Sequence, residues 1–197
     1  IVAAVRERGD GAVRKFSALF DGKALGPLEV PAAELARARA DIPGETLAAL
    51  ELAAARITAF QQAAMPPSWR DASAGYGEIV TPLARVGVYV PGGTAPLAST
   101  VLMTAIPARV AGVAEIVMCS PAPGDTMPAA ALLAAAHVAG VDRVFKIGGA
   151  QAIAALAYGT ETIPSVDLVC GPGNVFVTAA KKLVFGDVGI DGLYGPT

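Results

Sequence analysis

The chain has 197 residues, of which 54% are hydrophobic and 16% are charged, and its formal net charge is −2. This composition predicts a folded protein with a substantial core and argues against disorder. The slightly negative charge argues against a nucleic acid or an anionic membrane as a partner.

Cysteine content and the longest apolar tract restrict the class of protein further. The two cysteines, Cys119 and Cys170, are too few for a small disulfide-stabilised secreted domain, so we expect a reduced, cytoplasmic chain. The longest apolar tract, residues 97–118, contains a proline and two charged residues and is therefore not expected to span a membrane. The sequence opens within a helical pattern at Ile1 and stops after a Gly-Pro turn at Thr197, so we expect both ends to continue in a longer protein.

The first third of the chain is predicted to be mainly helical. Its helices are expected at residues 2–8, 11–20, 31–40 and 44–64, with Gly9 and Asp10 separating the first two. In the longest, the apolar residues of one face are Leu47, Leu50, Ala54, Ile57 and Phe60. A short edge strand is expected at residues 78–80, and Trp69, which follows two prolines, is expected to anchor a loop.

From residue 85 the pattern alternates between apolar strands and helices. Strands are predicted at residues 85–90, 115–120, 143–147 and 167–170, and helices at 100–112, 128–140, 150–159 and from 175 onward. A repeat of about 25–30 residues is typical of βαβ units. The sequence therefore predicts an α/β fold: an open, parallel, Rossmann-like sheet with helices on both faces, preceded by a mainly helical amino-terminal region.

Three of the four predicted strands run directly into glycine, in the strings VGVYVPGGT, VFKIGGAQ and LVCGPGN. Each turn places a polar or aromatic side chain beside its glycines, namely Tyr89, Gln151 and Asn174. Ligands of open parallel sheets bind beyond the carboxyl ends of the strands. The three turns therefore predict a site for a nucleotide or another small ligand, although the GxGxxG fingerprint of dinucleotide-binding proteins is missing.

Each of these three residues also has a structural interpretation. Asn174 precedes a predicted helix that carries Lys181 and Lys182 near its far end, so its side chain either caps that helix or faces a ligand. Tyr89 is either a core residue with its hydroxyl group at the rim or a ligand contact. Gln151 either serves only the backbone of its helix or contacts a ligand.

The residue pattern assigns no catalytic residue and no metal ligand. His137 is the single histidine and lies far from the glycine turns, so it is expected to be a surface or packing residue. Cys119 and Cys170 are expected to be buried apolar residues rather than nucleophiles. One histidine without an evident partner excludes a Ser-His-Asp or Cys-His arrangement.

Long strings of the sequence resemble the NAD-dependent histidinol dehydrogenases. The resemblance covers essentially all of residues 85–197 through VGVYVPGGTAPLASTVLMTAIPARVAGV, KIGGAQAIAALAYGTETIP and GPGNVFVTAAKKLVFGDVGID, and RERGDGAVRKFSALFDG resembles the amino-terminal region of that family. The resemblance implies oxidation of L-histidinol to L-histidine through an aldehyde, with two NAD used in succession, by an intertwined homodimer with one zinc per site. It divides the chain into residues 1–84, part of an incomplete first domain; 85–190, a Rossmann-like NAD-binding domain; and 191–197, the start of a return to the first domain.

The resemblance also implies roles for individual residues. Family residues that contact NAD match Tyr89, Gln151 and Asn174, the same three that the glycine turns indicate. Thr197 stands where the family commonly has the serine of a Gly-Pro-Ser-Glu motif that touches substrate, so it is the expected substrate contact. The preceding residues 192–194 also differ from the usual small, apolar run, which leaves open a paralogue that oxidises another amino or sulfonated alcohol.

The family's zinc ligands and its Glu-His general-base pair lie beyond the motif at which this sequence stops. We therefore expect this segment to be the cofactor-binding part of a longer enzyme and to be inactive alone. A third interpretation is a nucleotide-binding fragment without catalytic function.

Overall fold

The computed structural model describes residues 1–22, 26–92, 97–122 and 126–193, and a five-stranded parallel sheet lies at its centre. The strands lie in the order β5-β4-β3-β6-β7. Their bounds are Arg85–Tyr89 (β3), Glu115–Cys119 (β4), Arg143–Phe145 (β5), Leu168–Cys170 (β6) and Gly189–Ile190 (β7). The four predicted strands are present, and β7 is an addition that the sequence pattern did not indicate.

The first strand of the sheet lies in its middle. β3 pairs in parallel with β4 on one side, with Tyr89 opposite Cys119, and with β6 on the other, with Val88 opposite Cys170. Connections therefore run outward in both directions from β3, and the strand order reverses between β3 and β6. Such a switch point leaves a crevice beyond the carboxyl ends of the strands, where open α/β sheets bind their ligands.

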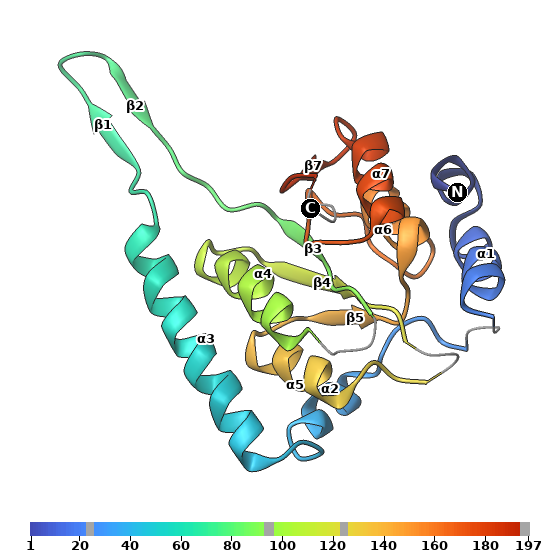
Figure 1. Cartoon of the computed structure of the whole chain (residues 1–197). Helices are drawn as coiled ribbons and strands as arrows, with labels where there is room; N and C mark the ends of the chain where they lie inside the picture. Colours follow the sequence, from blue (N-terminus) through green and yellow to red (C-terminus); the bar gives the residue numbers. More distant parts are fainter. Residues whose placement is uncertain (23–25, 93–96, 123–125, 194–197) are drawn as a thin grey trace.

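Helices cover both faces of the sheet, as Figure 1 shows. One face carries α4 (Ala98–Val110) and α5 (Ala130–Val138), and the other carries α6 (Gly149–Tyr158) and α7 (Val175–Val184). The remaining helices form an outer layer: α1 (Val2–Asp21) packs on α6, α2 (Ala32–Ala38) on α5, and α3 (Gly44–Ala64) on α4. This arrangement confirms the predicted α/β class, with a mainly helical region before the sheet. No helix within the described residues is long and apolar enough to cross a membrane.

The predicted break between the first two helices occurs inside α1. Gly9 has φ of +50° and ψ of −132°, outside the helical region, while helix continues on both sides. The backbone N–H of Asp10 donates to Glu161 Oε2 at 2.7 Å, which satisfies a donor at the start of the second half. A Cβ atom at position 9 would lie 2.2 Å from the same oxygen, so this contact requires glycine.

α3 has the predicted bounds, but its predicted apolar face is partly wrong. Leu50, Ala54 and Ile57 are half-buried and pack against the core on the α4 side of the sheet. Phe60 is 70% exposed. Phe60 lies six residues after Ala54, which places it about 120° from Ala54 around the helix axis. Its side chain therefore points away from the buried face.

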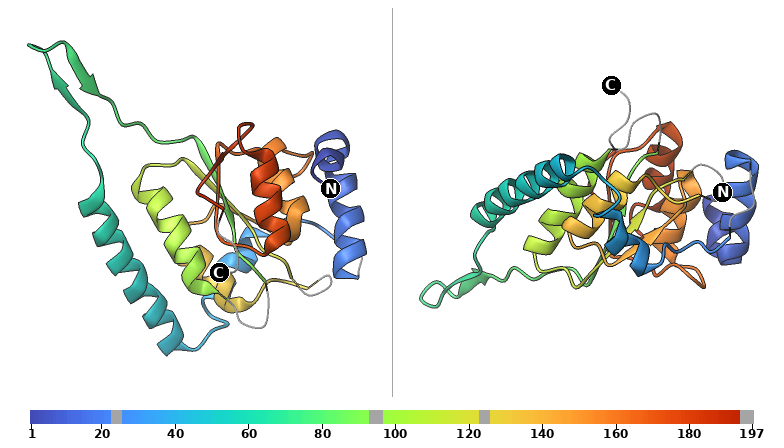
Figure 2. Two further views of the ribbon diagram at one scale, coloured as in Figure 1. Left: turned by 45° about the horizontal axis from the view of Figure 1, so that its top comes forward. Right: turned by 90° about the horizontal axis from the view of Figure 1, so that it is seen from below.

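A two-stranded hairpin projects from the body of the molecule after α3 (Figures 1 and 2). Its strands are β1 (Trp69–Asp71) and β2 (Tyr76–Glu78), paired antiparallel. The ring of Trp69 lies edge-on to that of Tyr76, with 5.8 Å between centroids, and its Nε1–H donates to Glu78 Oε2 at 3.3 Å. Trp69 therefore stabilises a hairpin. The edge strand predicted at 78–80 is wrong in position, because β2 ends at Glu78 and Ile79 is 84% exposed.

The outer edge of β5 is covered by residues 28–30. The N–H of Val30 donates to Val144 O, and the N–H of Lys146 donates to Leu28 O, each at 2.8 Å. Glu29 receives two hydrogen bonds from the Arg143 guanidinium, at 2.7 and 2.8 Å. The segment thereby satisfies backbone groups that an edge strand would leave unpaired.

Candidate functional site

A cavity of about 400 Å³ opens beyond the carboxyl ends of the strands. The loops after β3, β4, β5 and β6 all contribute to its wall, and two apolar side chains come from α1 and the residue that precedes it. The lining residues are Ile1, Phe20, Tyr89, Pro91, Gly92, Pro121, Gly148, Gly149, Ala150, Gln151, Asn174 and Phe176. Its volume falls within the range of small-molecule sites, roughly 300–1,000 Å³.

The three residues indicated by the glycine turns come together in this cavity. Tyr89 ends β3, Gln151 is the third residue of α6, and Asn174 directly precedes α7. Tyr89 and Gln151 are 62 positions apart in the sequence, and Asn174 follows later still. The parallel topology brings all three to one edge of the sheet. Their contact with a cofactor stays a prediction.

Tyr89 combines its two predicted roles in one side chain. It is 4% exposed, and it belongs to the core cluster on the α6 side of the sheet. Its hydroxyl oxygen accepts a hydrogen bond of 3.1 Å from the backbone N–H of Gly149. The ring is thus a core residue, while the hydroxyl group lies in the wall of the cavity at the start of α6.

Gln151 is the most informative residue of the cavity. Its side chain is 3% exposed and lines the cavity, yet it forms no hydrogen bond with any residue that the structure describes. The amide is not sealed in the core: its polar atoms are open to the cavity, where they can bind water or a ligand. The side chain is therefore held in the wall of the cavity with its amide donors and acceptor available to a ligand.

Asn174 acts as the N-cap of α7. Its Oδ1 accepts hydrogen bonds from the N–H groups of Phe176 and Val177, each at 3.1 Å. The structural interpretation of this residue is therefore correct. The cap does not involve the Nδ2 group of Asn174, and the N–H donors of that group have no acceptor among the described residues. The same exposed side chain can cap the helix through oxygen and donate to a ligand through nitrogen.

The glycines of the turns allow close packing around one proline. A Cβ atom at Gly92 would lie 2.5 Å from Pro121 Cγ, and one at Gly148 would lie 2.6 Å from Pro121 Cβ. Larger residues at these positions would push apart the loops that follow β3, β4 and β5. The two glycines therefore allow these three loops to pack closely together in the wall of the cavity.

The electrostatic character of the cavity favours an anionic ligand. The first turn of α6 and the start of α7 both line it, through Gly149, Gln151, Asn174 and Phe176. Helix N-termini carry about half a positive charge, which favours a nearby anion. Together with the apolar Phe176 and Phe20, the site offers an anion-binding end beside apolar surface.

The other candidate residues take no part in this site. His137 is exposed in the last turn of α5, in agreement with its predicted surface role. Cys119 is fully buried, and desolvation raises the pKa of its thiol strongly. Burial, and then the nearby Asp191 carboxylate, raise the pKa of the half-buried Cys170 to about 12. Neither thiol is activated as a nucleophile. Thr197 lies outside the described residues.

Zinc, which the family resemblance implies, has no matching donor set in this part of the chain. Among the residues whose positions the structure gives, no three His, Cys, Asp or Glu side chains converge. A catalytic zinc needs about three protein ligands of these types. The described residues therefore do not fit a zinc ion, and no step of the chemistry is assigned to one here.

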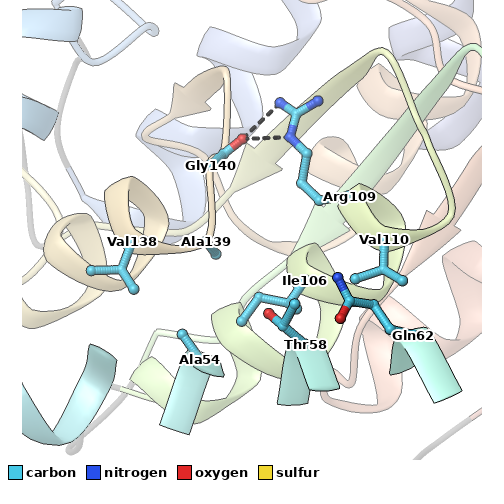
Figure 3. A pocket seen from close by; sticks show the side chains of 9 residues that line it. All are labelled: Ala54, Thr58, Gln62, Ile106, Arg109, Val110, Val138, Ala139 and Gly140. Carbon is cyan, nitrogen blue, oxygen red and sulfur yellow. Dashed lines mark hydrogen bonds between the residues drawn. The ribbon is translucent and has the colours of Figure 1, made fainter. Parts of the chain in front are cut away.

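A second cavity, of about 440 Å³, lies between α3, α4 and α5 (Figure 3). Its one charged lining residue is Arg109, whose guanidinium donates to Gly140 O at 3.0 and 2.7 Å and also to Val113 O and to the Asp142 carboxylate. These bonds tie together the loops that precede β4 and β5. The cavity therefore lies near the amino ends of the strands, and its arginine has a structural role.

Sequence patterns did not indicate Ile1, Phe20 or Phe176 as cavity residues. Phe20 lies in the last turn of α1, which packs across α6 and α7 from the far end of the sequence. Apolar residues at helix ends are ordinary, and only the tertiary arrangement shows that these side chains surround the site. Phe176 was within reach of prediction, because it follows the Gly-Pro-Gly-Asn turn by two residues.

Comparisons with known proteins agree with this architecture. A family model described as histidinol dehydrogenase matches residues 1–197. The chain is 52% identical over 198 residues to a histidinol dehydrogenase from Dehalococcoides mccartyi, and 53% identical over 203 residues to one from Syntrophotalea carbinolica. All of this chain is covered, but only 45% and 47% of those proteins. The chain thus spans about half the length of the curated relatives it matches.

A solved structure shows the same fold. The crystal structure of histidinol dehydrogenase from Elizabethkingia anophelis superposes with a TM-score of 0.93 at 34% sequence identity. The superposition covers 100% of this chain and 46% of the other.

Proposed function

Because the chain belongs to the histidinol dehydrogenase family, we propose that it forms the NAD-binding part of an enzyme that oxidises L-histidinol to L-histidine through the aldehyde, the last steps of histidine biosynthesis. Bound NAD supplies the hydride acceptor for this chemistry. The identity to curated relatives across the whole chain supports the activity. In this proposal the described residues bind NAD and orient it.

The cavity at the carboxyl edge is the proposed site for NAD. Its position at the switch between β3 and β6, its two helix N-termini and its apolar wall suit a dinucleotide. One observation carries the assignment: the side chain of Gln151 is only 3% exposed, and its amide opens into this cavity without a hydrogen-bond partner among the described residues. In this proposal Gln151 and the Nδ2 group of Asn174 hydrogen-bond the cofactor, and Tyr89 positions the start of α6 against it.

The proposal extends to the assembly and location of the protein. We propose a homodimer in the cytoplasm. The free thiols of Cys119 and Cys170 support a reducing compartment. Exposed aromatic side chains on the projecting hairpin, Trp69 at 48% and Tyr76 at 62% exposure, support a further contact surface.

Steady-state kinetics of the complete natural protein test this function. With L-histidinol and NAD we expect NADH to form, and we expect slower or no formation with other amino or sulfonated alcohols. Gln151→Leu keeps the size of the side chain but removes its amide, and should raise the KM for NAD by about tenfold or more, the equivalent of one lost good hydrogen bond.

Gln62→Leu is the matched control, since Gln62 is exposed and lines the other cavity. It should leave the KM for NAD unchanged. Absence of histidinol-dependent NADH formation by the wild-type protein would overturn the proposed activity. An unchanged KM in Gln151→Leu would instead overturn the proposed site.

A further inference from the structure

Lys181 is a buried cation in the last turn of α7. It is 2% exposed, and its Nζ donates to the carbonyl oxygen of Gly171 at 2.8 Å and to the carboxylate of Asp191. Asp191 directly follows β7, the outermost strand on that side of the sheet. A buried ammonium group is costly unless it is paired and hydrogen-bonded, and here both conditions are met.

Both members of this ion pair also hold the same backbone residue. The second carboxylate oxygen of Asp191 accepts a hydrogen bond of 2.8 Å from the N–H of Gly171. The N–H and the carbonyl oxygen of Gly171 are therefore both bound, one by Asp191 and the other by Lys181. Gly171 comes directly after β6 and opens the turn, residues 171–174, that ends in Asn174.

Gly171 is at the same time pressed against β3. Its φ is +111°, and a Cβ atom there would lie 2.1 Å from the carbonyl oxygen of Tyr89. The turn thus meets the end of β3 at the point where the strand order of the sheet reverses. Through Gly171 the ion pair controls the spacing between two residues of the cavity, Tyr89 and Asn174.

We propose that Lys181 and Asp191 are positioning residues of the dinucleotide site. Neither lines the cavity; they act by fixing the turn 171–174, so that Asn174 and the start of α7 face the cofactor. This inference rests on the proposed NAD site. A purely structural ion pair would stabilise the fold without affecting affinity for NAD, and this difference makes the two roles separable.

The double variant Lys181→Met/Asp191→Leu separates them. Replacing a buried ion pair with apolar residues of similar volume is often neutral or stabilising, so the variant is expected to fold, with its thermal unfolding midpoint lowered only by the two Gly171 backbone groups that lose their partners. The backbone of Gly171 loses both side-chain partners, so the Kd for NAD, measured by calorimetry on the complete natural protein, should rise about tenfold. Lys182→Met is the control, because Lys182 is the next residue of the same helix and is exposed; its Kd should equal that of the wild type.

A wild-type Kd in the folded double variant would overturn the inference. If that variant does not fold, Asp191→Asn supplies the measurement, since it keeps the shape of the side chain while removing the negative charge that pairs with Lys181. We expect its Kd to rise about threefold or more, and a wild-type Kd there would also overturn the inference. Failure of wild-type protein to bind NAD would instead refute the proposed function, whereas weakened binding in Gln151→Leu together with normal binding in the double variant would refute the positioning role alone.

Discussion

The hydroxyl group of Tyr89 accepts a 3.1 Å hydrogen bond from the backbone N–H of Gly149. Tyr89 ends the central strand β3, and Gly149 is the first residue of α6, which follows the edge strand β5. The bond therefore connects two walls of the cavity across the intervening strand β4. It also satisfies one of the N–H groups that the start of a helix leaves unpaired.

Tyr89→Phe should weaken both the fold and the site. Removing the hydroxyl group leaves the Gly149 N–H without its acceptor, so the free energy of unfolding should fall by about 1 kcal/mol and the Kd for NAD should rise several-fold. Urea unfolding and calorimetric titration measure the two effects. The control is Tyr158→Phe, whose hydroxyl donates to Asp187 at the surface. If both variants bind NAD as the wild type does, the Tyr89 hydroxyl has no role in the site.

Variants of Asn174 separate helix capping from ligand binding. Serine caps helices about as well as asparagine, so Asn174→Ser should keep wild-type stability, whereas Asn174→Ala should lose about 1 kcal/mol. Both substitutions remove the Nδ2 donor and should raise the Kd for NAD by a similar factor. Chemical unfolding with NAD titration checks the series. Wild-type affinity in Asn174→Ser would show that the residue serves only as a cap.

Two glycines with similar positive φ separate backbone strain from steric overlap. Gly171 has φ of +111° and Gly186 has φ of +103°, but a Cβ atom at Gly186 would meet nothing within 4 Å. Gly186→Ala should cost about 1–3 kcal/mol through backbone strain alone. Gly171→Ala should cost more, because its Cβ overlaps the Tyr89 carbonyl oxygen. Equal unfolding free energies in the two variants would contradict the close approach of β6 to β3.

The Glu29–Arg143 pair should make stability depend on pH in the acid range. The hydrogen bonds from Arg143 hold the pKa of Glu29 below its ordinary value of 4.5. A lowered pKa in the folded state contributes stability above the unfolded-state pKa, and this contribution disappears as the pH falls through the folded-state value.

Glu29→Gln should therefore lower the free energy of unfolding by up to about 1 kcal/mol at neutral pH, with the difference vanishing in strong acid. Urea unfolding of the wild type and of Glu29→Gln, from neutral pH to strong acid, measures this difference. Glu34→Gln is the control, since Glu34 lies 4.0 Å from Arg37 in an exposed i,i+3 pair. A difference between wild type and Glu29→Gln that persists or grows in strong acid would contradict the pairing.

Local patterns were sufficient for most of the sheet and for three residues of the cavity. Apolar strands alternating with helices predicted β3 to β6, and the geometry of parallel sheets predicted that Tyr89, Gln151 and Asn174 would share an edge. The strand β7 escaped prediction because its two residues carry no alternating pattern; pairing with β6 alone makes it a strand.

Other features depend on contacts between distant parts of the chain. Lys181 was expected near the end of a helix and does lie in the last turn of α7, but its burial against Asp191 was not predicted. A sequence pattern counts a lysine as polar and cannot show that a carboxylate ten residues later will pair with it. Likewise, Phe20 joins the cavity only because α1 packs on α6.

The most direct test of the NAD site is a crystal structure of the complete natural protein grown with saturating NAD. We predict electron density for the cofactor in the cavity beyond β3 and β6, with the Gln151 amide and the Asn174 Nδ2 group in hydrogen-bond contact with it. NAD bound elsewhere on the protein, or an empty cavity at saturating NAD, would contradict the assignment.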